Sequence, residues 1–311
     1  MTKLCELFPF KRKLGDFGIE IECEGKGLAN FESDKWNIVD DGSLRGRFPD
    51  ERAEYVLHSP LLLNDAIKAV NDLRNLQIAN NAKMDFSFRT SVHVHLNVQQ
   101  LTYPQYLNLI YIYLLLEEPL VRYCGDERIG NRFCLRLQDA EGLLDYLFDM
   151  FRQGPNCLFA FPEDAVRYAA INIAATRKYG SLEFRAMRGN MEVPYISTWL
   201  RSLYNLREFA KRFDNPQAVH DHFVKSSPSQ FMAEALGAEY MYFSYPGEVY
   251  ALRHSFSITL ELPYSYVDHE KAIAKALKMA KEPIIAPEHL LVKPLRPRNI
   301  IPNDNLGAVA G

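Results

Sequence analysis

Residues 16–24 read Asp-Phe-Gly-Ile-Glu-Ile-Glu-Cys-Glu, and four of the five positions that alternate with apolar residues are acidic. In an extended strand, side chains two positions apart share a face and lie roughly 7 Å apart. A strand here would place Glu20, Glu22 and Glu24 on one face. Such carboxylates repel one another unless a positive charge lies between them, and Mg²⁺, Mn²⁺ or Ca²⁺ is the usual neutraliser. The alternative is an acidic, solvent-facing edge strand; Gly18 favours a site, because glycine lets a ligand approach the backbone.

Two histidines share a face in a second alternating stretch, residues 91–98. His93 and His95 point to one side together with Ser91 and Asn97, and the residues between them are apolar. Two imidazoles on one face of an apolar strand are costly to bury without partners. A pair that serves only the core or the surface stays open as an alternative. If a metal binds, the many carboxylates and the absence of cysteine ligands favour a hard ion over structural zinc.

A carboxylate and a guanidinium share a face in residues 181–187, namely Glu183 and Arg185. They could simply pair with each other, or Glu183 could bind a metal while Arg185 binds phosphate oxygens. Tyr179-Gly180 predicts a tight turn and therefore a hairpin that brings Asn172 near Glu183. No glycine-rich phosphate-binding sequence is present. ATP, if used, would therefore be held by metals and arginines across an open sheet.

The composition excludes several classes of protein. The 311 residues are 48% hydrophobic and 24% charged, which is ordinary for a soluble globular chain. A net charge of −3 and a pI near 6.3 argue against direct binding of duplex nucleic acid. Five scattered cysteines without Cys-x-x-Cys spacing predict reduced thiols and a cytoplasmic location. The longest apolar run, near 109–116, is too short to span a bilayer.

The remaining pattern predicts how the chain is organised. Residues 1–14 are a lead-in, 15–282 form one domain with a helical second half, and 283–311 form a proline-rich extended C-terminal arm that could dock on a protein partner. Besides the stretches above, strands are predicted at 36–40, 53–57 and 168–174, with short strands at 240–243 and 255–260. Helices are predicted at 62–80, 103–123, 139–152, 192–212, 215–225, 228–236 and 268–281.

Five segments in this order resemble the amidoligase family, within the superfamily of carboxylate–amine ligases that includes glutamine synthetase and glutamate–cysteine ligase. The segments are Gly18-Ile-Glu-Ile-Glu22, Asp41-Gly-Ser43, Glu54-Tyr-Val-Leu-His-Ser-Pro-Leu61, Ser91-Val-His-Val-His95 and Gly180-Ser-Leu-Glu-Phe-Arg185. The resemblance spans about residues 15–190 and is carried by order and spacing rather than by any single segment. Family members are frequent in bacteriophage genomes, which would make the location a host cytoplasm.

The resemblance implies an α+β fold like the glutamine synthetase catalytic domain: a curved, largely antiparallel sheet with the active site on its concave face and helices on the other. It implies metal ligands at Glu20, Glu22, Glu54, His95 and Glu183. His95, Arg185 and Arg188 would bind ATP. Glu54 or His93 would accept the proton of the attacking amine, and both are catalytic candidates with Arg185. The chain departs from the family between Asp41 and Glu54, where Arg45, Arg47 and Arg52 add charge that alters substrate entry.

The function implied is ATP-dependent joining of a carboxylate to an amine through an acyl phosphate, with Mg²⁺ or Mn²⁺. The candidate substrates are amino acids, polyamines, peptide or protein carboxylates and modified nucleic-acid bases, and an oligomer is compatible with the sequence. A metal-dependent hydrolase that uses the same glutamates and histidines would need neither ATP nor an amine. A third alternative is a catalytically idle structural or virion-associated protein of the same fold, which the intact set of ligands disfavours.

Overall fold

One antiparallel sheet organises the computed structural model, which describes residues 2–8, 14–46, 48, 51–140, 142–160 and 168–267. Within these residues seven strands pair in the order β2-β3-β1-β5-β7-β6, and β4 pairs with the far end of β1. The strands are β1 (Phe17–Lys26), β2 (Trp36–Val39), β3 (Arg52–Leu57), β4 (Lys83–Asp85), β5 (Val92–Asn97), β6 (Ile171–Asn172) and β7 (Ser181–Phe184). The predicted α+β class with an antiparallel sheet is confirmed.

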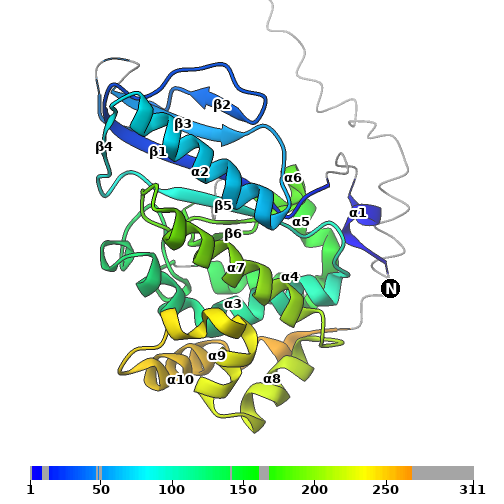
Figure 1. Cartoon of the computed structure of the whole chain (residues 1–311). Helices are drawn as coiled ribbons and strands as arrows, with labels where there is room; N and C mark the ends of the chain where they lie inside the picture. The colour runs from blue at the N-terminus through cyan, green and yellow to red at the C-terminus, as the bar shows by residue number, and fades with distance from the viewer. Residues whose placement is uncertain are drawn as a thin grey trace, which may run out of the picture.

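Ten helices lie within the described residues, and two of them, at 63–79 and 193–210, contact β1 and β5 of the sheet (Figure 1). They are α1 (Leu4–Leu7), α2 (Leu63–Ala79), α3 (Tyr103–Cys124), α4 (Leu143–Gln153), α5 (Cys157–Ala160), α6 (Ala175–Tyr179), α7 (Val193–Ala210), α8 (Pro216–Lys225), α9 (Pro228–Leu236) and α10 (Glu248–Ile258), with 3-10 turns between several of them. The buried side of β1 packs beneath α2, and α3 lies at the centre, in contact with α7, α8 and α10. None of the described helices combines the length and the apolar character that a membrane crossing requires.

Local signals explain where the helices begin. Thr102 and Gln105 form a reciprocal capping box at the start of α3, and Pro104 occupies its first turn. The side chains of Asn215 and Ser227 cap α8 and α9, each followed by a proline at the first helical position. These features confirm the helices predicted at 103–123, 215–225 and 228–236. The helices at 62–80, 139–152 and 192–212 are also confirmed, with shifts of a few residues at their ends.

Most differences from the predicted elements lie in the second half of the chain, although β4 and α1 were not predicted either. Residues 240–243 and 255–260 are not strands, because the 3-10 helix η4 (Gly237–Tyr242) and α10 occupy most of these positions. The strand predicted at 168–174 shrinks to the two residues of β6. The tight turn at Tyr179-Gly180 is instead the short helix α6, which ends at Gly180 in a left-handed conformation with φ +70°. The helix predicted at 268–281 and the arm 283–311 lie outside the described residues.

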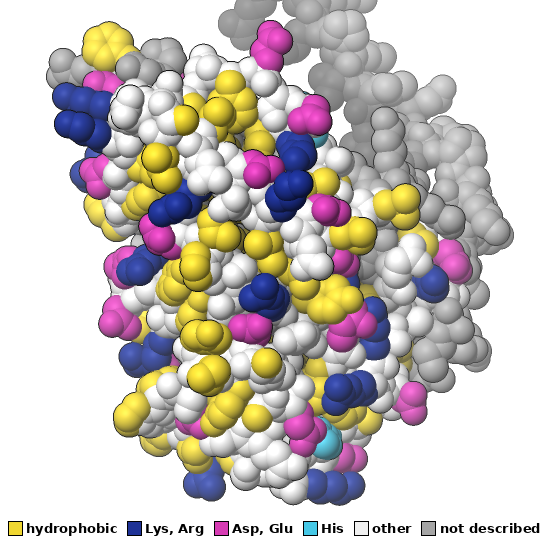
Figure 2. All heavy atoms as spheres, in the orientation of Figure 1, with side chains coloured by type: hydrophobic (Ala, Val, Ile, Leu, Met, Phe, Trp, Pro, Cys, Tyr) yellow, Lys and Arg dark blue, Asp and Glu magenta, His cyan; other side chains and the backbone are white. Residues whose placement is uncertain are grey.

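Charges are mixed on the helical side of the molecule. On the face shown in Figure 2, which carries α2 and α7, acidic and basic side chains alternate over short distances.

Residues 1–14 were predicted to be a lead-in, but Leu4 and Leu7 of α1 are fully buried in the core. The glutamate and histidine side chains of β1, β3, β5 and β7 lie instead on the opposite face of the sheet.

Candidate active site

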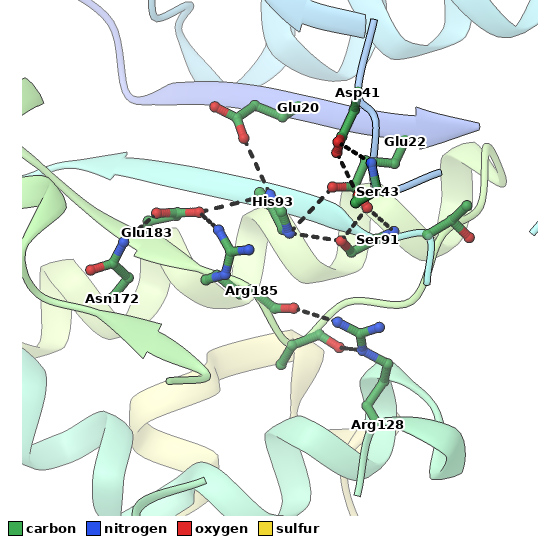
Figure 3. Close-up of polar contacts among 12 residues, drawn as sticks. Glu20, Glu22, Asp41, Ser43, Ser91, His93, Arg128, Asn172, Glu183 and Arg185 are labelled. Atoms are coloured by element: carbon green, nitrogen blue, oxygen red, sulfur yellow. Dashed lines mark hydrogen bonds and ion pairs between the residues drawn. The ribbon is translucent and has the colours of Figure 1, made fainter. Parts of the chain in front are cut away.

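The strand register brings the predicted carboxylates and histidines onto one face. Glu20 pairs directly with His93, and Glu22 pairs with Glu54. His95 pairs with Glu183 on its other side, and Glu183 pairs with Asn172. Opposite positions in antiparallel strands hold their side chains about 5 Å apart on the same face. The polar faces of β1, β3, β5 and β7 therefore merge into one surface, as the alternation predicted (Figure 3).

Glu20 lies at the centre of this surface, with one carboxylate oxygen toward each histidine. Its Oε2 is 3.2 Å from His93 Nδ1, and its Oε1 is 3.3 Å from His95 Nε2. Burial alone would raise the pKa of Glu20, but its hydrogen bonds and charge interactions with the two imidazoles outweigh burial and hold the pKa well below its usual range. Burial would lower the pKa of His95, but Glu20 and Glu183 raise it overall. The two groups therefore favour an ion pair when no metal is bound.

Glu183 is buried and engaged on both oxygens. Asn172 Nδ2 donates to its Oε2 at 2.7 Å, and the Arg185 guanidinium donates to Oε1. Burial would raise the pKa of Glu183, but the charges of His95, His93 and Arg185 lower it overall. The predicted closeness of Asn172 and Glu183 is confirmed. Glu183 and Arg185 do pair with each other, yet the Arg185 Nε is buried without a partner among the described residues.

Glu22 and Glu54 face each other but have different environments. Ser91 donates its backbone N–H and its hydroxyl to the same Glu22 oxygen, at 2.8 and 2.6 Å. No hydrogen bond or ion pair reaches the Glu54 carboxylate from the part of the chain that the structure describes. Burial, together with the charges of Glu20 and Glu22, raises the pKa of Glu54 to about 8. The cluster therefore holds an excess of negative charge at Glu54, which protonation relieves when no cation is bound.

Two groups of side chains could each hold a metal ion, and both contain Glu20. One combines Glu20, Glu54 and His93; the other combines Glu20, His95 and Glu183, and within each group the candidate ligand atoms lie within 4.8 Å of one another. Carboxylate oxygens with an imidazole suit Mg²⁺ or Mn²⁺, and neither group includes a cysteine. The donor set thus fits a pair of hard divalent ions with Glu20 between them. Glu22 belongs to neither group and stays a predicted ligand.

A cavity of about 250 Å³ opens beside Glu20 and His95. Its lining includes Asn37, Tyr179 and Gly18, but no lysine or arginine among the residues that form it. A Cβ atom at Gly18 would lie 3.3 Å from the Cβ of His95, so glycine leaves room for that imidazole and for a ligand. The Tyr179 ring meets His95 edge-on at 5.5 Å. A small reactant could therefore lie next to the candidate metal groups.

Two arginines differ in how they relate to the cluster. Arg188, predicted to contact phosphate, lies over the Tyr195 ring and 3.6 Å from Glu127; its role stays a prediction. Arg128 had no predicted role, yet it is fully buried and donates to the carbonyl oxygens of Arg185 and Ala186, each at 2.9 Å. Nothing in the sequence spacing could have revealed this contact, because it joins positions 57 and 58 residues apart.

The pKa of Glu54 leads to a measurable proton release. With a pKa of about 8, Glu54 is mostly protonated at pH 7, and a bound cation would displace that proton. We expect Mn²⁺ binding at pH 7 to release close to one proton from Glu54, in addition to any proton that His95, whose pKa is raised, loses. Titration calorimetry in buffers of different ionisation enthalpy measures the release, and Glu54→Gln should lower it by about one proton.

The same pKa fixes the sign of the pH dependence of stability. Folding raises the pKa of Glu54 above its usual value near 4.3, so the metal-free folded state holds a proton that the unfolded state lacks between about pH 4.3 and 8. This contribution to the free energy of unfolding is present below that window and is lost as the pH rises through it.

In the calorimetric titration with Mn²⁺, equal proton release by wild type and Glu54→Gln would contradict both expectations, because it would show that Glu54 is already ionised.

Comparison with known proteins identifies one family. The model of a family described as "Putative amidoligase enzyme" matches residues 17–206, which include all five strands that carry the cluster and its partner Asn172. A comparison with curated proteins gives no match.

Proposed function

The chain belongs to the family described as "Putative amidoligase enzyme", whose model covers more than half of it, and on this premise we propose that it is an ATP-dependent carboxylate–amine ligase. One observation carries the proposal: Glu20 belongs to both groups of potential metal ligands on one face of the sheet. Phosphoryl transfer depends mainly on positioning and charge neutralisation, which paired divalent cations supply. A family name alone would not specify ATP or metals; the donor set supports them.

In this proposal, the glutamates and histidines of the cluster hold metal ions, and arginines together with His95 contact ATP. Glu20, Glu54 and His93 would hold one Mg²⁺ or Mn²⁺, and Glu20, His95 and Glu183 the other, with Glu22 beside them. These ions would neutralise the triphosphate and polarise the transferred phosphoryl group. Arg185 would contact phosphate oxygens through guanidinium nitrogens that Glu183 does not use, and its unpartnered Nε supports this role. His95 and Arg188 are further proposed contacts for ATP.

The proposed reaction has two displacements. An oxygen of the substrate carboxylate attacks the γ-phosphorus of ATP, and ADP leaves. The nitrogen of the amine then attacks the acyl carbon, and inorganic phosphate leaves with the oxygen that came from the carboxylate. The amine loses one proton, which Glu54 or His93 would accept, although both also belong to the first candidate metal group. Glu54 is the better candidate of the two, because the metal group uses one carboxylate oxygen and no described residue binds the other.

Isotope transfer tests this reaction while the two substrates are still unidentified. Purified protein is incubated with ATP, Mg²⁺, a mixture of amino acids and peptides labelled with ¹⁸O in their carboxylates, and amines that include spermidine. We expect an ATP-dependent amide and one ¹⁸O atom in each phosphate released. Unlabelled phosphate without an amide would indicate an ATPase, and water-dependent cleavage without ATP would indicate a metal-dependent hydrolase. Either result would overturn the proposal.

A further inference from the structure

Two arginines lie over one exposed phenylalanine at the end of the sheet face. The Phe88 side chain is 49% exposed, and the guanidinium carbons of Arg45 and Arg89 are 5.3 and 5.7 Å from its ring centroid. Arg45 comes from the loop between β2 and β3, and the other two residues precede β5. We name Arg45, Phe88 and Arg89 the arginine clamp. Stacking on one ring brings two like charges together, which is costly unless an anion joins them.

Neither guanidinium forms an ion pair with a carboxylate of the residues that the structure describes. Arg89 donates one N–H to the carbonyl oxygen of Ser43 at 3.1 Å, and its Nε is buried without a partner among the same residues. Glu24 accepts from the backbone N–H of Arg45 at 2.7 Å, not from the guanidinium. Within the described residues, the two guanidinium groups therefore keep donors that no carboxylate binds.

Two stretches of chain connect the clamp to the candidate active site: β1 and the residues that precede β5. Ser91, which donates to Glu22, follows Arg89 by two residues. Ser43, whose carbonyl oxygen accepts from Arg89, also donates its hydroxyl to Asp41 (Figure 3). Glu24, which fixes the backbone of Arg45, is four positions beyond Glu20 on β1. At about 3.3 Å per residue, Glu24, which binds the backbone of Arg45, lies on the order of 13 Å from Glu20 along β1.

We propose that the arginine clamp binds an acidic residue of a peptide whose reacting carboxylate lies at Glu20. The inference rests on the proposed ligase function and assigns its carboxylate substrate to acidic peptides. A free dicarboxylic amino acid is too short, because its carboxylate carbons are separated by four bonds of about 1.5 Å and span about 5 Å. About four extended peptide residues span the distance from Glu20 to the clamp. The exposed Phe88 ring supplies an apolar surface for the stem of the bound side chain.

Neighbouring charges limit how the clamp works. The hollow beside Arg45 is lined by Glu24, Glu51 and Asp85 as well as by Lys26 and Lys83. The surface is therefore not uniformly positive, and general attraction of anions is weak at physiological salt, where charges are screened within about 8 Å. Recognition depends on direct contact between a carboxylate and the two guanidinium groups over the ring.

Binding to labelled peptides tests the inference. The probes are fluorescein-labelled hexaglutamate and hexaglutamine, measured by fluorescence anisotropy with the full chain, Mg²⁺ and 0.15 M salt. We expect wild type to bind hexaglutamate about tenfold more tightly, which corresponds to about 1.4 kcal/mol. Arg45→Gln/Arg89→Gln should abolish this preference. Arg152→Gln is the matched control, because Arg152 is an exposed arginine over a phenylalanine ring on α4, and it should keep the preference.

Folding of the variants must be checked, because Arg89 also holds the loop at Ser43. If the double variant loses its melting transition, Arg45→Gln alone carries the test: Arg45 is exposed, and we expect about a threefold loss of preference. Equal binding of both peptides by wild type, or a preference that survives in a folded double variant, would overturn the inference. So would equally tight, clamp-dependent binding of a single-stranded DNA hexamer.

The outcome separates the inference from the proposed function, because binding needs no turnover. Clamp-dependent binding without ATP-dependent amide formation would contradict the proposed ligase function and support peptide binding by the arginine clamp. Amide formation from neutral and acidic peptides with equal kcat/KM would keep the ligase and remove the clamp as a specificity determinant.

Discussion

Glu20→Gln is expected to lower the rate of ATP-dependent amide formation by at least about 10³-fold, or about 4 kcal/mol of transition-state stabilisation. Glu20 is the one residue common to both candidate metal groups, and its two oxygens face different histidines. Glutamine keeps the shape of the side chain but removes the charge that would lie between the ions. Loss of such a ligand should also weaken Mn²⁺ binding at least tenfold, since even residues that support metal ligands contribute that much.

The control for this substitution is Asp85→Asn. Asp85 is an exposed carboxylate on β4, which also pairs with β1, and it belongs to neither metal group. We expect its activity and Mn²⁺ affinity to match wild type within about twofold. If Glu20→Gln were folded and retained more than about a tenth of the activity, Glu20 would not hold metal during the reaction.

Arg128→Ala is expected to lower the free energy of unfolding by about 3 kcal/mol and to reduce kcat by on the order of 10²-fold. Arg128 is fully buried and binds two carbonyl oxygens in the segment that follows β7. Its removal leaves two buried acceptors without donors, at about 1–3 kcal/mol each, and opens a cavity. The segment also carries Arg185, and a displacement of about 1 Å at such a residue can cost about 10²-fold in rate.

Urea denaturation and steady-state kinetics test this prediction together. Arg132→Ala is the matched control, because Arg132 lies in the same loop but is exposed over the Phe133 ring. Arg128→Lys should recover only part of the stability, since an ammonium group lacks the fixed fork that reaches both carbonyls. A positioning role requires kcat to fall more than KM rises. A stability change below about 0.5 kcal/mol would show that Arg128 does not hold this segment.

Alternation of residue types made the central strands predictable. In β1, β5 and β7 each polar side chain lies between two apolar ones, and only an extended strand with one buried face fits that pattern. The capping residues Asn215 and Ser227, each followed by proline, likewise marked real helix starts. In contrast, the aromatic residues at 240–243 suggested strands, but packing of η4 against α7 and α9 overrides that preference.

The candidate site was only partly predictable for a related reason. Side chains that share a strand face, such as His93 and His95, follow from the sequence because their relation is local. The contact of Ser91 with Glu22 and that of Arg128 with the carbonyl of Arg185 depend on register between distant segments. Register is set by the turns and helices that intervene, and a period of two cannot encode it. Burial, which raises the pKa of Glu54, is a property of the assembled fold for the same reason.

The position at which divalent cations bind is the most direct test of the proposed site. Anomalous diffraction from crystals soaked with Mn²⁺ and a non-hydrolysable ATP analogue measures this position. We expect two Mn²⁺ peaks within about 2.0–2.3 Å of Glu20 oxygens, one shared with Glu54 and His93 and the other with His95 and Glu183. Peaks away from this sheet face, or none while His93 and His95 still occupy the Glu20 oxygens, would contradict the proposed site.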